Sequence, residues 1–344
     1  MVTTMKIKFF AILIFIALVA GNLPAQDRII LGGSKAVIMV VDAVYLFPEA
    51  GLKVVASAKG DQGLGIFLAA IDPSYAKRPI FETSAGAETY ASFKPDLVIM
   101  KSANKKSLGP ALDALNIQQL YLNLENPDDY YSEIALLGKL FKNEKRAAEV
   151  IAWYKSEVTK VTDKTAFIKQ TDKRKVLVLQ PSAGAEGVWE VPPASWIQTM
   201  MVELSGGIPV WTSTNPGSGW GKVNAEQIAA WNPDVIFMIN YKDNPEKSAE
   251  NLLKDGRLAG VSAVKSGSVY GFVKDFYSWD QPDTRWILGL RWMAAKLNPA
   301  LFPDFSAISL AKNFFSFAYG MDEKLFNQTI MPRLSGAVEV KAGK

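Results

Sequence analysis

Residues 87–100 read AETYASFKPDLVIM, and residues 225–238 read AEQIAAWNPDVIFM. The two stretches share Ala, Glu, Ala, Pro, Asp and Met in the same register. Each begins as a short amphipathic helix with Glu in its first turn. Pro followed by Asp then ends the helix before a run of residues typical of a buried strand. This duplicated helix–turn–strand unit predicts two similar α/β lobes with a cleft between them.

The rest of the chain extends this two-lobed pattern. Strands that alternate with helices indicate largely parallel sheets in both lobes, which we place at residues 27–142 and 171–303. A helical pattern at residues 304–334 predicts helices that pack back on the body. We expect residues 335–344 to form a loose tail.

Between the lobes the sequence predicts one long helix over residues 143–170. Asn143 is a typical N-cap, Glu144 follows it, and no Pro or Gly occurs before Pro181. Apolar residues recur at alternating spacings of four and three from Ala147 to Ile168. A helix of about 25 residues would be roughly 38 Å long. We therefore expect only slight hinge motion between the lobes.

The N-terminus has the pattern of a cleavable secretory signal over residues 1–25. Lys6 and Lys8 precede an uncharged apolar run at residues 9–21, and small residues follow before Gln26. An uncleaved anchor is the alternative. The chain has no cysteine, which a lipid attachment site would require. We expect a periplasmic protein that is not a lipoprotein.

The composition argues against most enzymes. The chain has neither histidine nor cysteine, so no Ser-His or Cys-His nucleophile can form and a zinc site would need carboxylates alone. The longest basic run, at residues 173–175, is too short to indicate a nucleic-acid partner. We expect a protein that is not an enzyme and that carries no cofactor and no metal of its own.

The order lobe, long helix, lobe, with A-E-x-x-A-x-x-x-P-D before a strand in each half, resembles a family of periplasmic binding proteins. These capture ferric siderophores, haem or cobalamin and deliver them to ATP-driven importers. The phrases LSGG at 204–207, VKSGSVY at 264–270 and PDTRWILGL at 282–290 support the resemblance, which covers about residues 28–334. It implies a monomer that binds one small-molecule chelate and docks on a membrane permease dimer.

Aromatic residues at loop-like positions of the second lobe are candidates for contact with a bulky ligand. Trp220 lies in a Gly-rich segment, residues 215–221, that suits neither a helix nor a strand. The other candidates of this kind are Trp189, Tyr241, Phe276 and Trp279. Trp153, Trp196, Trp231, Trp286 and Trp292 lie in helical patterns, and we expect them in the core.

Polar residues of the first lobe follow predicted strands, where open α/β sheets place their ligands. These candidates are Ser34, Lys35, Asp61, Gln62, Ser84, Ala85, Gly86 and Lys101. Lys35, Lys101, Lys222 and Arg285 are suited to pairing with an anionic ligand. Tyrosine ligation of haem remains open. Some cobalamin-type relatives carry an aromatic residue six positions before the Glu of the first repeat. This chain has Glu82 there, which argues against a close match to the cobalamin-binding members.

The leading hypothesis is a substrate-binding protein of an ABC importer that captures an iron chelate of the siderophore type. Alternatives in the same class bind a corrinoid, haem, or an oxoanion such as molybdate or tungstate. A chelatase-like enzyme that acts on a tetrapyrrole is the alternative of another class. The resemblance also implies that Glu88 and Glu226 dock against permease arginines, although Glu in the first turn of a helix is favoured by the helix dipole alone.

Overall fold

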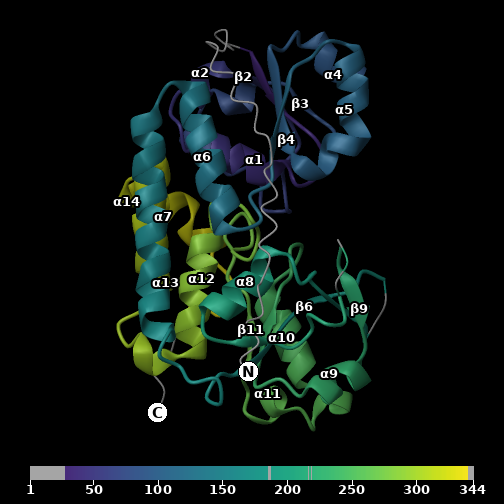
Figure 1. Ribbon diagram of the computed structural model, residues 1–344, viewed down its shortest axis with the longest axis vertical. Coiled ribbons are helices and arrows are strands. Elements are labelled where there is room, and N and C mark those ends of the chain that lie inside the picture. The colour runs from purple at the N-terminus through teal and green to yellow at the C-terminus, as the bar shows by residue number, and fades with distance from the viewer. Residues whose placement is uncertain (1–27, 185–186, 216, 218, 340–344) are drawn as a thin grey trace, which may run out of the picture.

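The computed structural model describes residues 28–184, 187–215, 217 and 219–339. Figure 1 shows two lobes joined along one side by long helices. The predicted fold class is confirmed: each lobe is a sheet flanked by helices, and one long helix connects them. The predicted signal peptide at residues 1–25 lies outside the described residues.

The first lobe contains a five-stranded parallel sheet in the order β3-β2-β1-β4-β5. Its strands are β1 (Ile29–Leu31), β2 (Val54–Ala58), β3 (Ile80–Phe81), β4 (Leu97–Lys101) and β5 (Gln119–Leu122). Its helices are α1 (Val37–Val44), α2 (Ala50–Lys53), α3 (Leu68–Ile71), α4 (Ala87–Ser92), α5 (Lys105–Ala114) and α6 (Pro127–Phe141). Short 3-10 turns lie at Tyr75–Lys77 and Ser102–Asn104.

The second lobe has a mixed sheet in the order β11-β10-β6-β7-β9, with β8 paired to β6. Its parallel part is β6 (Lys175–Pro181), β8 (Ile208–Pro209), β10 (Val235–Met238) and β11 (Val269–Gly271). The short strands β7 (Trp189–Val191) and β9 (Gly221–Val223) add an antiparallel edge. The helices are α8 (Ile197–Leu204), α9 (Ala225–Trp231), α10 (Pro245–Leu253), α11 (Ser262–Lys265) and α12 (Trp286–Leu297), with 3-10 turns at Gly256–Leu258 and Pro299–Leu301.

The repeated Pro-Asp pair has the same structural role in both lobes. The Asp96 carboxylate accepts the backbone N–H of Arg28 at 3.1 Å, just before β1. The Asp234 carboxylate accepts the backbone N–H of Lys175 at 2.7 Å, at the start of β6. Because each Asp also donates its own backbone N–H to the carbonyl of the same partner residue, the repeat strand is held in register with the central strand of its sheet.

The connecting helix α7 (Glu144–Thr165) begins as predicted, with the Asn143 side chain accepting the backbone N–H of Arg146 at 3.1 Å. Its 22 residues correspond to about 33 Å, which is shorter than expected. The helix ends at Thr165, whose hydroxyl donates to the carbonyl of Leu204 at 2.9 Å. This contact ties the end of the helix to α8, and the chain then turns toward β6.

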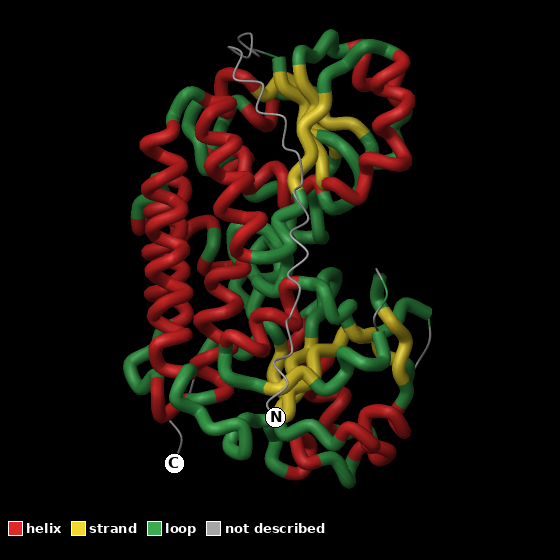
Figure 2. The backbone as a smooth tube through the Cα atoms, viewed as in Figure 1, coloured by secondary structure: helices red, strands yellow, loops and turns green. Residues whose placement is uncertain are grey.

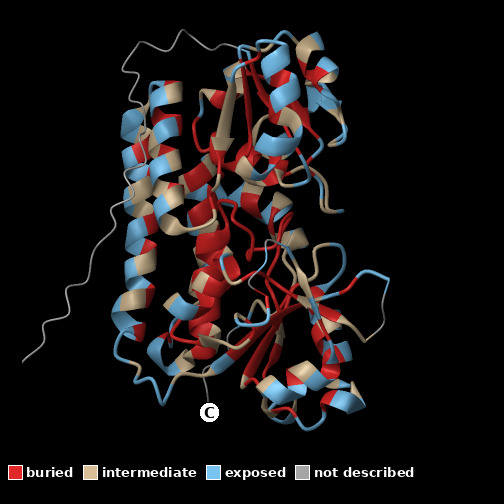
Figure 3. Ribbon diagram, turned by 45° about the vertical axis from the view of Figure 1, so that its right-hand side comes forward, coloured by how far each residue is buried: buried red, intermediate tan, exposed pale blue. Residues whose placement is uncertain are grey.

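The C-terminal helices α13 (Ala307–Tyr319) and α14 (Glu323–Thr329), followed by a 3-10 turn at Met331–Arg333, pack against both lobes. The rings of Phe315 and Tyr319 lie 5.4 and 4.9 Å from the ring of Phe67 in the first lobe. Figure 2 shows these helices alongside α7, and Figure 3 shows the buried residues concentrated in the sheets and the helices that join them.

The prediction of a loose tail from residue 335 is wrong for residues 335–339. Ser335 exchanges two backbone hydrogen bonds with Lys274, and Ala337 donates to the carbonyl of Gly271. The segment therefore adds to the edge of the second lobe, because the backbone beside β11 offers it unpaired groups. Residues 340–344 lie outside the described residues. Among the described helices, none combines the length and apolar character needed to cross a bilayer.

Candidate functional site

A cavity of about 470 Å³ lies between the lobes and is lined by residues of both. The first lobe contributes Lys35, Ala36, Met39, Lys59, Asp61, Gln62, Lys101, Ala103 and Glu125. The second lobe contributes Trp196, Gln198, Trp220, Tyr241, Lys242, Gln281 and Pro282. A larger and more open hollow beside α5 and β5 is lined by the first lobe alone. We identify the cavity between the lobes as the candidate site because it lies where the strands of both sheets end.

The lining residues of the first lobe lie at or shortly after the carboxyl ends of its parallel strands. Lys101 ends β4, and Lys59 and Asp61 follow β2. The Asp61 carboxylate accepts the backbone N–H groups of Gly63 and Gly65 at 2.7 and 3.1 Å. Both glycines have positive φ, 94° and 91°, which other residues rarely adopt. The Asp61 side chain therefore holds the backbone of the loop that follows it in one conformation.

The cavity carries an excess of positive charge. Lys101 is 4% exposed, and its ammonium group pairs with Glu125 at 2.9 Å. Lys35, Lys59 and Lys242 are exposed and have no ion-pair partner within the described part of the chain. An anionic group entering the cavity would therefore meet cations from both lobes.

The second lobe presents an aromatic wall, which we define as Trp196, Trp220 and Tyr241. The Trp196 and Trp220 rings meet edge to face at 5.7 Å, and Trp220 meets Tyr241 in the same way at 6.3 Å. Tyr241 donates its hydroxyl to the buried carboxylate of Asp280 at 2.8 Å. Burial raises the pKa of the Asp280 carboxyl, and burial beside this carboxylate raises the pKa of the Tyr241 hydroxyl well above 10. The hydroxyl therefore stays protonated.

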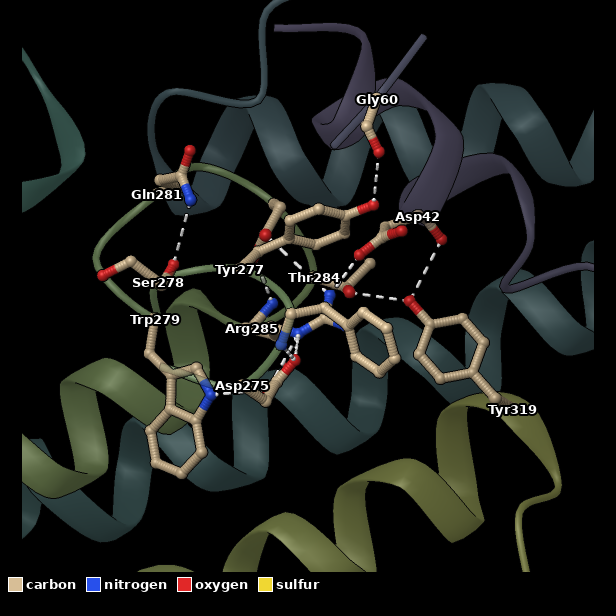
Figure 4. Close-up of polar contacts among 12 residues, drawn as sticks. Asp42, Gly60, Asp275, Tyr277, Ser278, Trp279, Gln281, Thr284, Arg285 and Tyr319 are labelled. Carbon is tan, nitrogen blue, oxygen red and sulfur yellow. Dashed lines mark hydrogen bonds and ion pairs between the residues drawn. The ribbon is translucent and has the colours of Figure 1, made fainter. Parts of the chain in front are cut away.

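Beside the cavity the two lobes contact one another directly. Gln62 and Gln281 exchange two amide hydrogen bonds, at 2.8 and 3.3 Å. Tyr277 donates its hydroxyl to the carbonyl of Gly60 at 3.0 Å (Figure 4). Since residues 274–285 are all buried, this segment links the second lobe to the first beneath the ligand cavity.

Arg285 lies in a fully buried cluster of charged side chains. Its guanidinium pairs with Asp275 at 2.8 Å and with Asp42 of α1, and Asp283 lies 3.9 Å away. The rings of Phe67, Tyr277 and Phe315 surround it at 4.7, 5.0 and 5.2 Å. Burial raises the pKa of Asp42 to about 6, against the lowering effect of Arg285. Burial likewise raises the pKa of Asp283 well above its ordinary value.

The structure brings six of the predicted ligand-binding residues to the cavity, which are Lys35, Asp61, Gln62, Lys101, Trp220 and Tyr241. The others lie elsewhere. Ser34 follows β1 with its backbone N–H bonded to Asn104, and Ser84, Ala85 and Gly86 precede α4. None of these four lines the cavity.

Four further predicted residues have side chains that are buried outside the cavity. Trp279 donates its indole N–H to Asp275 at 2.8 Å, and Arg285 lies in the charge cluster. Phe276 packs under the guanidinium of Arg333 at 4.3 Å, and Trp189 of β7 packs under that of Arg257 at 5.6 Å. Segment 274–285 resembles an exposed loop in sequence, but it is buried, and Asp275 accepts hydrogen bonds from Trp279 and Arg285 within the segment itself.

The sequence analysis missed other lining residues. Trp196, expected in the core, is half-buried, and it is the N-cap of α8 with an extended backbone (φ −88°, ψ 161°) rather than a residue inside the helix. Pro192-Pro193, just ahead of it, could have indicated that the helix begins later. Lys59 and Lys242 follow β2 and β10, so the strand-end rule that selected Lys101 applied to them as well. No sequence pattern pointed to the lining residues Gln198, Gln281 and Glu125.

Known proteins of similar sequence include the substrate-binding lipoprotein YvrC of an ABC transporter in Bacillus subtilis. It is 24% identical over 71% of this chain and 76% of its own length. The molybdate-binding protein MolA of Haemophilus influenzae is 20% identical over 69% of this chain and 70% of its own length.

Solved structures resemble the fold closely. The molybdate-bound MolA structure has a TM-score of 0.70 at 17% identity and covers 88% of this chain and 95% of its own. A periplasmic solute-binding protein from Veillonella parvula has a TM-score of 0.70 at 22% identity and covers 89% of this chain and 92% of its own.

The similarity to YvrC corrects one expectation. We expected a periplasmic protein that is not a lipoprotein, but YvrC is a lipoprotein and matches most of this chain. The expected location is therefore wrong as stated. The expectation rested on the N-terminal pattern and on the absence of cysteine, and not on the folded lobes.

The family model for periplasmic binding proteins matches residues 79–275, which is more than half of the sequence. The match includes both copies of the repeat and the connecting helix α7. Taken with the two lobes and the cavity between them, it shows that this chain belongs to the periplasmic binding protein family.

Proposed function

We propose that this chain is the substrate-binding protein of an ABC importer and that it captures an anionic iron chelate of the siderophore type for delivery to a membrane permease. The observation that carries this proposal is that one cavity contains both the aromatic wall and three lysines without an ion-pair partner among the described residues, Lys35, Lys59 and Lys242. Flat apolar surface and a few charged groups are what a bulky anionic chelate requires. Under this proposal the chain has no enzymatic activity.

The size of the cavity favours a chelate over a bare oxoanion. Its volume of about 470 Å³ falls in the range of about 300–1,000 Å³ that is usual for drug-sized ligands. Water occupies about 30 Å³ per molecule, so an ion with four oxygens would fill only a minor part of the space. The aromatic wall would have no partner in such a complex.

The metal would remain inside its chelate. Among the described residues, no group of three or more His, Cys, Asp and Glu side chains is placed to hold a metal ion. The Tyr241 hydroxyl donates to Asp280 and has a pKa well above 10, which disfavours a phenolate ligand for haem iron. We infer that the protein recognises the outer surface of a complete complex.

Molybdate or a related oxoanion is the second candidate, supported by the similarity to MolA and by the lysines. A calorimetric panel separates the two. The protein should bind a ferric tris-catecholate with quenching of tryptophan fluorescence and should bind molybdate weakly or not at all. Tight molybdate binding without chelate binding would overturn the proposal. Native mass spectrometry and an absorption spectrum of protein purified from its own host would then identify the natural ligand.

A further inference from the structure

Gln198 occupies an unusual position in the candidate site. It lies in the first turn of α8, lines the cavity and is 2% exposed. Its side-chain nitrogen donates to the Asp280 carboxylate at 2.9 Å. Its side-chain oxygen, by contrast, has no hydrogen-bond partner within the described residues. A buried acceptor without a donor is unfavourable, so a ligand that brings an N–H or O–H group to this oxygen would gain a hydrogen bond.

Asp280 determines which way the Gln198 amide faces. The carboxylate is fully buried and accepts hydrogen bonds from both the Gln198 amide and the Tyr241 hydroxyl. An ionised carboxylate only accepts, so the NH₂ group of Gln198 must face Asp280 and its carbonyl must face away. Turning the amide over would place two acceptor oxygens against each other.

We propose that Gln198, held in this orientation by Asp280, is a specificity-determining residue that selects ligands with an N–H or O–H donor. The inference rests on the proposed function and narrows its ligand to an anionic chelate that carries amide N–H groups at its edge. A ligand whose surface offers only acceptor oxygens, such as an oxoanion, would leave the Gln198 carbonyl unpaired and repelled. A site built to bond a donor discriminates strongly against an analogue that lacks it.

Two matched probes test this inference. One is a ferric tris-catecholate with secondary amides, and the other is the same chelate with its amides N-methylated. By titration calorimetry, wild-type protein should prefer the N–H form by about tenfold or more, since a lost buried hydrogen bond is of that order. Gln198→Met should bring the ratio close to one. Gln180→Met is the matched control, because Gln180 bonds Glu190 at 2.8 Å in the same lobe but does not line the cavity.

The outcomes separate this inference from the proposed function. If neither chelate binds wild-type protein, the proposed function fails and this inference fails with it. If both bind equally well, only the inference fails. The wild-type comparison needs no variant and so does not depend on whether Gln198→Met folds. A preference that survives unchanged in folded Gln198→Met would also overturn the inference.

The role of Asp280 is tested through the same ratio. Asn at position 280 offers an NH₂ group that would turn the Gln198 amide over, so Asp280→Asn should reduce the preference for the N–H chelate. The same substitution in the Gln198→Met background should leave the ratio unchanged. A purely structural role would instead weaken binding of both chelates equally in both backgrounds, and that result would remove Asp280 from the proposal.

Discussion

Arg285 of the second lobe and Asp42 of the first form an ion pair across the lobe boundary, and both side chains are fully buried. Asp275 and Asp283 lie on the same guanidinium, so three carboxylates share one arginine. Such a cluster is favourable only if part of its negative charge is neutralised by a proton. The raised pKa values of Asp42 and Asp283 agree with this requirement. The cluster therefore connects the two lobes, and the stability of this connection, which we call the joint, depends on the protonation state of its carboxylates.

Removal of the arginine should destabilise the whole protein. Arg285→Met leaves three buried acids without a cation, and breaking a buried ion pair in this way costs about 3–5 kcal/mol. Urea unfolding at neutral pH measures the loss. Arg257→Met is the control, because the Arg257 side chain is 55% exposed and pairs with Asp255 at the surface, where a pair contributes about 1 kcal/mol or less. Equal stability of the two variants would contradict the role of Arg285 in the joint.

Asp42 should make the free energy of unfolding depend on pH between about 4 and 6. Its pKa is about 6 in the folded protein and 3.8 as an ordinary aspartate. In that window the folded state binds a proton that the unfolded state has lost, so the contribution of Asp42 to stability falls as pH rises. The full change is on the order of 3 kcal/mol.

The variant Asp42→Asn isolates this effect, because Asn is neutral at every pH and can still accept a bond from Arg285. Urea unfolding of both proteins from pH 4 to pH 7 gives the comparison. The stability of wild-type protein relative to the variant should decline across the window and then level off. Parallel curves for the two proteins would show that Asp42 does not titrate there.

The success of the sequence analysis followed from local rules. The Pro-Asp pairs at residues 95–96 and 233–234 identified the lobes because each encodes a helix end and a strand register over a few residues. Strand-end positions selected Lys101 and Asp61 for a similar local reason. By contrast, Phe276, Trp279 and Arg285 of segment 274–285 lie outside the cavity. The burial of this segment depends on Asp42, which lies 243 positions from Arg285, and no local pattern reports so distant a partner.

Trp220 should be an anchor for the ligand. Its ring meets both other members of the aromatic wall, and it lines the cavity. Trp220→Ala should weaken binding of the ferric tris-catecholate by about 1–3 kcal/mol and reduce the fluorescence quenching. Trp231→Ala is a suitable control, because Trp231 ends α9 in the same lobe and does not line the cavity. Unchanged affinity in folded Trp220→Ala would remove this residue from the site.

Ligand binding should close the lobes only slightly. They are joined by the helix α7, by the buried Arg285–Asp42 pair and by the Gln62–Gln281 amides. A helix and a packed joint resist bending more than a pair of loops would. Small-angle X-ray scattering with and without the ferric chelate should therefore give nearly the same radius of gyration. A marked decrease on binding would show that the joint opens and closes.

Glu88 and Glu226 are the residues that we expect to dock on the permease. Both are exposed in the first turn of a helix, α4 in one lobe and α9 in the other. Figure 1 shows these helices on the side of the molecule that faces away from α7. One carboxylate on each lobe suits a partner with two-fold symmetry, and charge pairing of this kind sets orientation and association rate.

Helix capping is the competing explanation, and the structure separates the two residues on this point. In α9, Asn224 and Gln227 already form a complete capping box, so Glu226 is not needed as a cap. In α4, Gly86 is the N-cap and provides no side chain, so Glu88 can contribute about 0.3–1 kcal/mol through the helix dipole. Because both carboxylates lie in the first turn and interact with the helix dipole, Glu88→Gln and Glu226→Gln should each lower the melting temperature only slightly. Uptake through the cognate importer should fall strongly in the double variant while its affinity for the chelate is retained. Normal uptake in the double variant would leave the helix dipole as the explanation for Glu88 and would leave Glu226 without a docking role.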